Sequence, residues 1–422
     1  MAARLGALSL LVTDVRPLRE SPAYRRLWFG QTVSQLGAQM AAVTIAYQVY
    51  VITRSSFAVG LVGLFALVPL VAFGLYGGAL VDAFDRRTVA LVSALGLWAC
   101  SLVLVAQAYA GVDSVGLLYG VVAVQSGLFA VNNPARSAML PRLLRAELLP
   151  AANALSMASF NLGMTVGPLL AGVLIGWHGV EVTYSVDALT FLAALYALVR
   201  LPPVPPAERT GTPGLRSVLE GLRFLRHAPN LRMTFVLDLC AMVLAQPRAL
   251  FPALALGVYA GGPSTLGLLQ AAPAIGSIVA FSVSGWIGRV HRHGLAVAVA
   301  VAAYGAAVLL AGVGAVGLPG VLWLVVTLLA LTGSADMVSS AYRSTMLQTA
   351  APDALRGRLQ GVFTVVVAGG PRLGDFVAGS LASATSEPVA LVVGGAACVV
   401  GVVLAVSLNR RFLAYDAREP TP

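Results

Sequence analysis

Apolar runs of about 20 residues recur along the whole chain, and only short polar stretches separate them. A helix needs about 20 apolar residues to cross a hydrocarbon core about 30 Å thick, where lipid offers its backbone no hydrogen-bond partners. Charged residues make up only 10% of the chain, so we expect an all-α integral membrane protein. The twelve predicted transmembrane helices cover residues 27–52, 57–81, 88–108, 115–136, 151–176, 180–200, 232–258, 263–287, 294–314, 319–341, 357–384 and 388–408.

The positive charges predict how these helices are oriented. All 27 basic residues are arginine, and all but three lie at the termini or on connections that would share one side of the membrane. Cytoplasmic connections are rich in basic residues, so we expect both termini to face the cytoplasm and the chain to span the plasma or inner membrane. The exceptions are Arg54, on an opposite connection, and Arg248 and Arg372, inside predicted helices. Charge spread over short connections argues against a nucleic-acid partner.

The residue types that the chain lacks exclude several classes of enzyme. Without lysine it has no phosphate-binding P-loop, so we expect no ATP. The three cysteines, Cys100, Cys240 and Cys398, lie in apolar runs without metal-ligand spacing, so we expect no metal and no cofactor. We therefore expect a monomer that is not an enzyme, with the lipid bilayer, a small-molecule substrate and protons as partners.

The second half of the chain repeats the first at one ungapped offset of 207 residues. This offset aligns Pro22 with Pro229 and Arg136 with Arg343. Further aligned pairs are Gln39 and Gln246, Gly60 and Gly267, Gly78 and Gly285, Gly163 and Gly370, Gly167 and Gly374, and Gly172 and Gly379. Six helices in each repeat keep the two halves in one orientation, as in transporters whose halves rock about a site near the membrane midplane.

The repeat also predicts how the chain is divided. The expected segments are a cytoplasmic N-terminal segment (1–26), a six-helix bundle (27–200), a cytoplasmic linker (201–230), a second six-helix bundle (231–408) and a cytoplasmic tail (409–422). In the linker, apolar residues from Leu215 to Leu225 recur at helical spacing, with Arg216 and Arg223 on the other face. We expect an amphipathic helix that either lies on the membrane surface or packs beneath the two halves.

The connection after the second predicted helix carries a spaced set of glycine, acidic and basic residues. Its members are Gly78, Asp82, Asp85, Arg86 and Arg87. The set resembles the signature of the major facilitator superfamily, although Ala83 and Asp85 replace the usual arginine and glycine. The resemblance implies a twelve-helix transporter with two pseudo-symmetric halves and a cytoplasmic gate formed by these residues. The second copy has Arg289 where Asp82 would fall, so the first copy is expected to form the gate.

The fifth predicted helix has glycines close to a proline, and their positions are Gly163, Gly167, Pro168 and Gly172. This set resembles the antiporter motif of exporters in the same superfamily. Residues 238–252 and 369–375 are similar to the branch that holds enterobactin exporters and macrolide-efflux-like proteins. The resemblance implies secondary active export of a siderophore, a macrolide-like natural product or a drug, in exchange for protons. A proton-coupled importer and a transport-inactive sensor are the alternatives.

Ionisable residues inside predicted helices are the candidates for proton coupling. They are Asp238, Arg248, Arg372 and Asp375, in the seventh and eleventh helices. A buried charge is costly in the membrane and faces a partner or a water-filled cavity, so these residues either carry protons or form static ion pairs. Asp187 is expected to reach the outer interface, and Asp336 is expected to pair with Arg343.

In the first half, amide side chains take the place of charges. The candidates for lining a substrate cavity are Gln31, Gln35, Gln39, Gln125 and Asn161. The first three recur every fourth residue and form a polar stripe along one helix. Such a stripe either packs against neighbouring helices or lines a cavity for an amphipathic solute.

Overall fold

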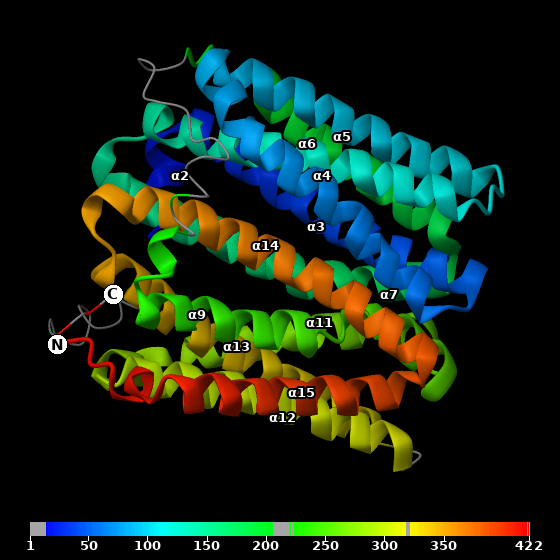
Figure 1. Cartoon of the computed structure of the whole chain (residues 1–422). Helices are drawn as coiled ribbons and strands as arrows, with labels where there is room; N and C mark the ends of the chain where they lie inside the picture. The colour runs from blue at the N-terminus through cyan, green and yellow to red at the C-terminus, as the bar shows by residue number, and fades with distance from the viewer. Residues whose placement is uncertain (1–13, 206–219, 221–222, 318–320, 420, 422) are drawn as a thin grey trace, which may run out of the picture.

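The computed structural model describes residues 14–205, 220, 223–317, 321–419 and 421, and these residues form helices and connections without any strand. The first half holds α2 (Arg16–Glu20), α3 (Pro22–Thr53), α4 (Ser56–Ala83), α5 (Arg86–Tyr109), α6 (Val115–Leu143) and α7 (Leu149–Val199). The second holds α9 (Pro229–Leu239), α11 (Gly262–Ser282), α12 (His293–Gly317), α13 (Leu322–Ala350), α14 (Asp353–Ala384) and α15 (Glu387–Leu408), drawn in Figure 1. Between α9 and α11 the chain continues through short π, 3-10 and α turns up to Val258.

Ten helical segments of the described chain are long and apolar enough to cross a membrane, which confirms the predicted fold class. One of them includes all of α7, whose helical path is broken at Gly179, where φ is 81°. The repeat places Gly179 opposite Ser386, in the connection between α14 and α15. We therefore describe α7 as two arms, 149–178 and 180–199. The 32-residue α14 is not one of the ten, and the count of twelve stays a prediction.

The helix bounds follow the sequence repeat. Both ends of α6 and α13 differ by 207 residues, as do the first residues of α3 and α9 and those of α5 and α12. Local signals explain several of these starts. In α3, Pro22 is the first helical residue, and the Ser21 hydroxyl accepts a hydrogen bond of 3.1 Å from the Tyr24 amide. The two halves are thus built by one pattern of starts and stops.

The outer surface of the bundle is apolar, as a lipid-facing surface must be. Many large apolar side chains are more than one-third exposed, and Trp177, Phe281, Trp323 and Leu408 are more than two-thirds exposed. The buried side chains form several clusters, and one of them extends across α9, α12, α13 and α15 and reaches α3 and α7 of the first half. In a bilayer, lipid chains rather than water would cover the exposed set.

The two halves meet through glycines at one end of the molecule. A Cβ built on Gly172 of α7 would lie 3.1 Å from the Cα of Gly267 in α11. A Cβ built on Gly379 of α14 would lie 3.2 Å from the Cα of Gly60 in α4. The repeat relates these two crossings, because Gly60 aligns with Gly267 and Gly172 with Gly379. Small residues let helices approach this closely.

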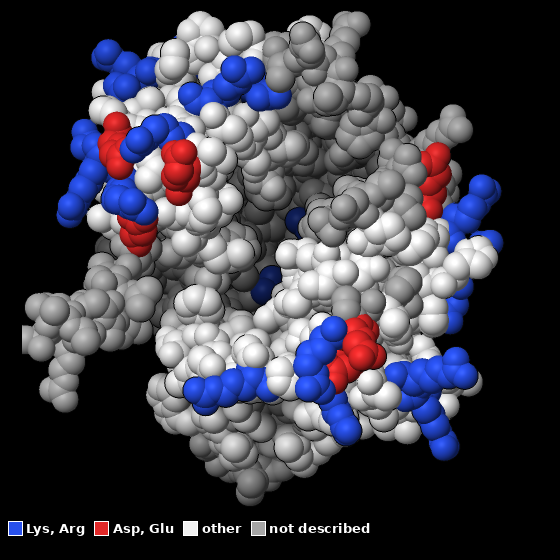
Figure 2. Space-filling model, turned by 90° about the vertical axis from the view of Figure 1, so that its left-hand side faces the viewer, with Lys and Arg blue, Asp and Glu red and all other residues white. Residues whose placement is uncertain are grey.

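The other end of the molecule, here called the arginine-rich end, is where α3, α5 and α12 begin and α6 and α13 end. Figure 2 views this end and shows basic side chains on both lobes, with a hollow between the lobes. Blue atoms are visible deep in that hollow. The structure is therefore open between its halves at the arginine-rich end and closed at the glycine crossings.

Candidate functional site: a shared arginine in the second half

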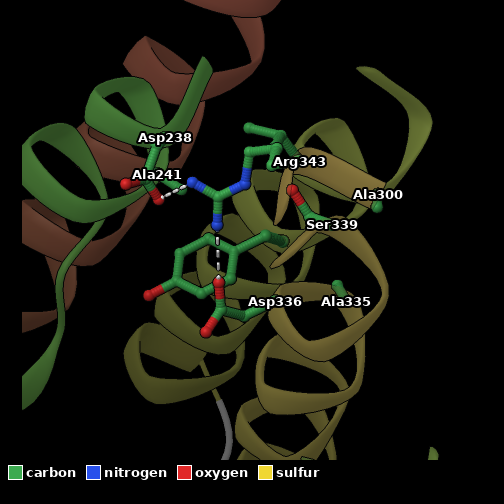
Figure 3. Close-up of a pocket in the computed structure, with 9 residues that line it drawn as sticks. Asp238, Ala241, Ala300, Ala335, Asp336, Ser339 and Arg343 are labelled. Atoms are coloured by element: carbon green, nitrogen blue, oxygen red, sulfur yellow. Dashed lines mark hydrogen bonds and ion pairs between the residues drawn. The ribbon is translucent and has the colours of Figure 1, made fainter. Parts of the chain in front are cut away.

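Arg343 of α13 lies between two carboxylates from two helices (Figure 3). One terminal nitrogen of its guanidinium forms a close ion pair with Asp238 of α9. The other lies 3.4 Å from Oδ1 of Asp336, one to two turns earlier on α13. The exposed fraction of the side chain is 4% for both Arg343 and Asp238, and 41% for Asp336. One cation is thus shared between a buried and an accessible carboxylate.

Three helices build a small pocket around this cluster. Tyr304 and Ala300 of α12 line it, together with Ser339 of α13 and Ala241, which follows α9. The Ser339 hydroxyl and the Nε of Arg343 are buried and have no hydrogen-bond partner in the described chain. A buried polar group without a partner is costly, so these two groups add to the energetic cost of the cluster in this state.

The sequence predicted only part of this cluster. The pair between Asp336 and Arg343 is confirmed. The connection predicted after residue 341 is wrong, because α13 continues to Ala350 and Arg343 is a buried helical residue. No ion pair in the described chain joins Asp238 to an arginine of α14. The alignment of Arg136 with Arg343 was the sequence signal for a position that both halves share.

The other candidates for proton coupling lie near one another without a direct ion pair in the described chain. Arg372 of α14 donates a hydrogen bond to the Ala368 carbonyl of its own helix. Asp375 has one buried carboxylate oxygen without a hydrogen bond. Arg248, in the turn that follows α9, and Arg372 are both close enough to act on the charge of Asp375. Arg372 and Asp375 lie three residues apart on α14, but they form no ion pair with each other.

The structure corrects the sequence prediction for the position of Asp187. It was expected to reach the outer interface, but it is 1% exposed, in the second arm of α7. Its Oδ2 accepts a hydrogen bond of 2.6 Å from the Ser101 hydroxyl, and its Oδ1 has no partner. Gly37 of α3 leaves the space that this carboxylate occupies, since a Cβ there would lie 2.9 Å from Oδ1. The hydrophobic run around Asp187 gave no sign of the Ser101 contact.

Three of the predicted gate residues form hydrogen bonds with other parts of the first half and the start of the linker. Asp85 caps α5 through the Thr88 amide (2.9 Å) and also accepts from the Val204 amide (2.7 Å). Arg86 donates to the Ala138 carbonyl of α6, and Arg87 donates to the last carbonyls of α7. These contacts tie the ends of α5, α6 and α7 to the start of the linker. The surroundings of Gly78, the side chain of Asp82 and most of the predicted linker helix lie outside the described residues.

The glycines of the antiporter-type motif contact both halves. Cβ atoms built on Gly163 and Gly167 would lie 2.9 Å from Cγ of Gln35 and 2.6 Å from Cβ of Gln39. These two glycines therefore let α7 pack on the amide stripe of α3, whereas Gly172 meets the second half. Pro168 lies inside the first arm of α7 and is buried. The motif thus joins the amide stripe to the crossing between the halves.

The amide candidates have the groups needed to bind a solute. The side chains of Gln31, Gln35, Gln39, Gln125 and Asn161 are half-buried and make no hydrogen bond in the described chain. In contrast, the amides of Gln48 and Gln107 bond to each other, and Tyr184 donates to the first of them. Packing on α7 and open hydrogen-bonding capacity therefore occur together in the stripe, and a role of these amides in lining a substrate cavity stays a prediction.

A second hollow, of about 620 Å³, lies between α4, α5 and α6. Phe73, Phe84, Val92 and Val124 line it, and all four side chains are substantially exposed. Among the described residues, those that line this groove carry no charge. Its surface is suited to lipid chains rather than to polar chemistry.

Comparisons with known proteins agree with this architecture. The sequence profile of the family described as "Transmembrane secretion effector" matches residues 12–421. The enterobactin exporter EntS of Citrobacter koseri is 28% identical over 421 residues, which cover 96% of this chain and 95% of that protein. A mutant of the nucleoside transporter NupG has a similar structure, with a TM-score of 0.75, 12% identity and coverage of 92% and 100% of the two chains. A bacterial homologue of the iron transporter ferroportin in its inward-facing state gives a TM-score of 0.68, 16% identity and coverage of 92% and 98%.

Proposed function

Because the chain belongs to the transmembrane secretion effector family, within the major facilitator superfamily, we propose that it exports a small amphipathic molecule by alternating access. It is a membrane transporter and not an enzyme. A siderophore is the first candidate substrate, because the relative from Citrobacter koseri is an enterobactin exporter. A macrolide-like natural product or a drug is a further candidate substrate, because it also combines an apolar body with several polar groups.

The direction of transport follows from the orientation that we propose. Arginine-rich connections face the cytoplasm in membrane proteins, so the hollow at the arginine-rich end would open to the cytoplasm. In this state a cytoplasmic solute can enter between the halves, and the glycine crossings close the outer side. Export then requires the crossings to part and the arginine-rich ends to close. The gate residues from Gly78 to Arg87 would act at that closing end.

Proton coupling is the finer part of the proposal, and the shared arginine is the observation that supports it. Asp336 is the accessible carboxylate of the cluster, and the charged or titratable groups around it are Arg343, Asp238, Tyr304 and, farther away, Arg248. A proton that binds Asp336 from the outer side would cancel its charge and leave Arg343 to Asp238 alone. Release of that proton to the cytoplasm would restore the shared arrangement that the structure describes.

Such a switch couples proton movement to rocking, because the share of the Arg343 charge that is available to Asp238 differs between the two protonation states. Asp238 lies on α9, whereas Asp336 and Arg343 lie on α13. Changing one charge therefore alters how strongly these two helices are joined. In the same way, movement of α14 against the turns after α9 would change the distances between Arg248, on those turns, and the two α14 residues Arg372 and Asp375.

Flux in everted membrane vesicles tests this proposal. Enterobactin, with the amphipathic anion 1-naphthoate as a second probe, is added to vesicles that have been energised to acidify their interior. The account predicts accumulation of a probe inside the vesicles, partial collapse of the proton gradient when the probe is added, and loss of accumulation with an uncoupler. Accumulation that ignores the uncoupler would contradict proton coupling, and uptake in right-side-out vesicles alone would contradict export.

A further inference from the structure

Arg136 of α6 occupies the position in the first half that Arg343 occupies in the second. The two arginines are 207 residues apart, and each stands seven residues before the end of its helix, at Leu143 and Ala350. Their surroundings also correspond. Ser339 and Ala300 line the pocket of Arg343, and the aligned Asn132 and Ser93 contact each other through a hydrogen bond of 2.7 Å.

The two positions differ in their carboxylates. The repeat places Gln31 where Asp238 stands and Phe129 where Asp336 stands. Arg136 makes no ion pair or hydrogen bond in the described chain, and its Nε is buried without a partner. The side chain itself is half-buried. The first half therefore keeps the cation and lacks both of the anions that neutralise it in the second half.

A half-buried guanidinium without a partner is costly unless an anion from outside the chain completes it. Arginine presents donors in a planar fork that fits a carboxylate bidentately. The aligned position in the second half binds two carboxylates within the chain. An amide at Gln31, which has no hydrogen bond in the described chain, and a ring at Phe129, which is 47% exposed, would suit the polar and apolar parts of one molecule.

We propose that Arg136, with Gln31 and Phe129, binds the anionic group of the transported molecule, and that this molecule is an organic carboxylate with an apolar body. The inference rests on the proposed export function and narrows its substrate class. The first half would then hold the substrate's negative charge, and the second half would hold the exchanging proton. Each half would use the same arginine position for a different anion.

Binding of two probes of matched shape tests this inference without any flux. Purified full-length protein in nanodiscs of phosphatidylcholine is titrated calorimetrically with 1-naphthoate and with its neutral counterpart, 1-naphthamide. Wild type is expected to bind the naphthoate about tenfold more tightly, because charge-assisted hydrogen bonds to arginine are the strong ones. Arg136→Gln should remove this preference, so that the two probes bind with similar affinity. Arg142→Gln, which removes an exposed arginine of the same helix, should keep it.

A second variant keeps the arginine and supplies the missing anion. Gln31→Asp places a carboxylate where the second half has Asp238, so Arg136 would pair within the chain. This variant should also lose the preference for naphthoate, and its melting temperature should not fall. If Arg136→Gln fails to fold, the Gln31→Asp variant still tests the inference.

Equal affinity of wild type for both probes, or a preference that survives both Arg136→Gln and Gln31→Asp, would overturn the inference. Loss of the naphthoate preference when phosphatidylglycerol is added to the nanodiscs would assign the site to a lipid phosphate, which also overturns it. A preserved preference in a protein that transports nothing would contradict the proposed export and not this site.

Discussion

Gly172 of α7 and Gly267 of α11 meet so closely that no side chain fits between their helices. The repeat forms the same contact again between Gly379 and Gly60. These crossings join the halves at the end opposite the hollow, and the Ser56 hydroxyl adds a hydrogen bond of 2.8 Å to Glu387 there. Rocking between the two open states must separate both crossings.

Gly172→Val should therefore shift the protein toward the state that is open on the outer side. The added Cβ would lie 2.6 Å from the Pro263 carbonyl oxygen, so α7 and α11 must move apart. A cysteine at the buried Thr265 should then react several-fold faster with a membrane-impermeant maleimide. Gly176→Val is the matched control, because a Cβ there meets nothing within 4 Å. Equal labelling rates in the two variants would contradict this role for the crossing.

The ion pair of Arg343 should have a large effect on stability. Arg343→Gln leaves Asp238 buried without its cation, and breaking a buried pair in this way costs about 3–5 kcal/mol. Asp238→Asn combined with Arg343→Gln should melt at a higher temperature than Arg343→Gln alone, because the more deeply buried of the two carboxylates is then neutral. Arg145→Gln, at an exposed pair with Glu20, should change the melting temperature little. A double variant that melts below both single variants would show that the pair is not what stabilises this site.

Asp187 should behave as a structural carboxyl group. The described chain offers it no cation, and an uncompensated charge in such a site is costly, so a neutral amide should replace it with little loss. Asp187→Asn is expected to keep both its melting temperature and its export, whereas Asp187→Leu should lose about 1–3 kcal/mol by leaving polar groups without partners. Loss of gradient-driven export in Asp187→Asn, at normal stability, would make Asp187 a proton carrier instead.

We expect substitutions at the two aspartates of the proposed gate to have different effects, one on stability and the other on transport. Asp85→Ala removes the cap of α5 and the bond to the Val204 amide, so it should cost about 1–2 kcal/mol of stability. Asp82→Asn keeps the volume of the side chain and removes its charge, so it should reduce transport while the melting temperature stays near that of wild type. Flux at equal expression, compared with melting in detergent, checks both variants. Wild-type flux in Asp82→Asn would contradict the gate.

The sequence predicted the architecture well because hydrophobic length, arginine placement and the internal repeat are all properties of the linear chain. Even the break at Gly179 falls between the predicted fifth and sixth helices. Helix ends were harder to predict, since α6 and α13 continue past their apolar runs. Arg343 therefore falls on a predicted connection, and its ion pair with Asp238 was not predicted.

Side-chain partners depend on how helices are rotated and how deeply they lie, and spacing along the chain does not fix either. Arg372 and Asp375 share a helix face, yet they form no ion pair. Asp187 resembles a residue near the interface until the packing of α5 places Ser101 beside it. The repeat is the one sequence signal that identified an equivalent pair of sites, at Arg136 and Arg343, and the structure shows how their environments differ.

Gradient-driven flux in proteoliposomes that carry Asp336→Asn tests the central claim, that protonation of Asp336 leaves Arg343 to Asp238 alone and so couples a proton to export. The variant keeps the size of the side chain and the partner Asp238, so it should insert, fold and exchange labelled for unlabelled substrate at rates near those of wild type. The account predicts that an imposed pH gradient no longer drives uphill accumulation in this variant, although it does so in wild type. Uphill accumulation at the wild-type level in Asp336→Asn would contradict the account.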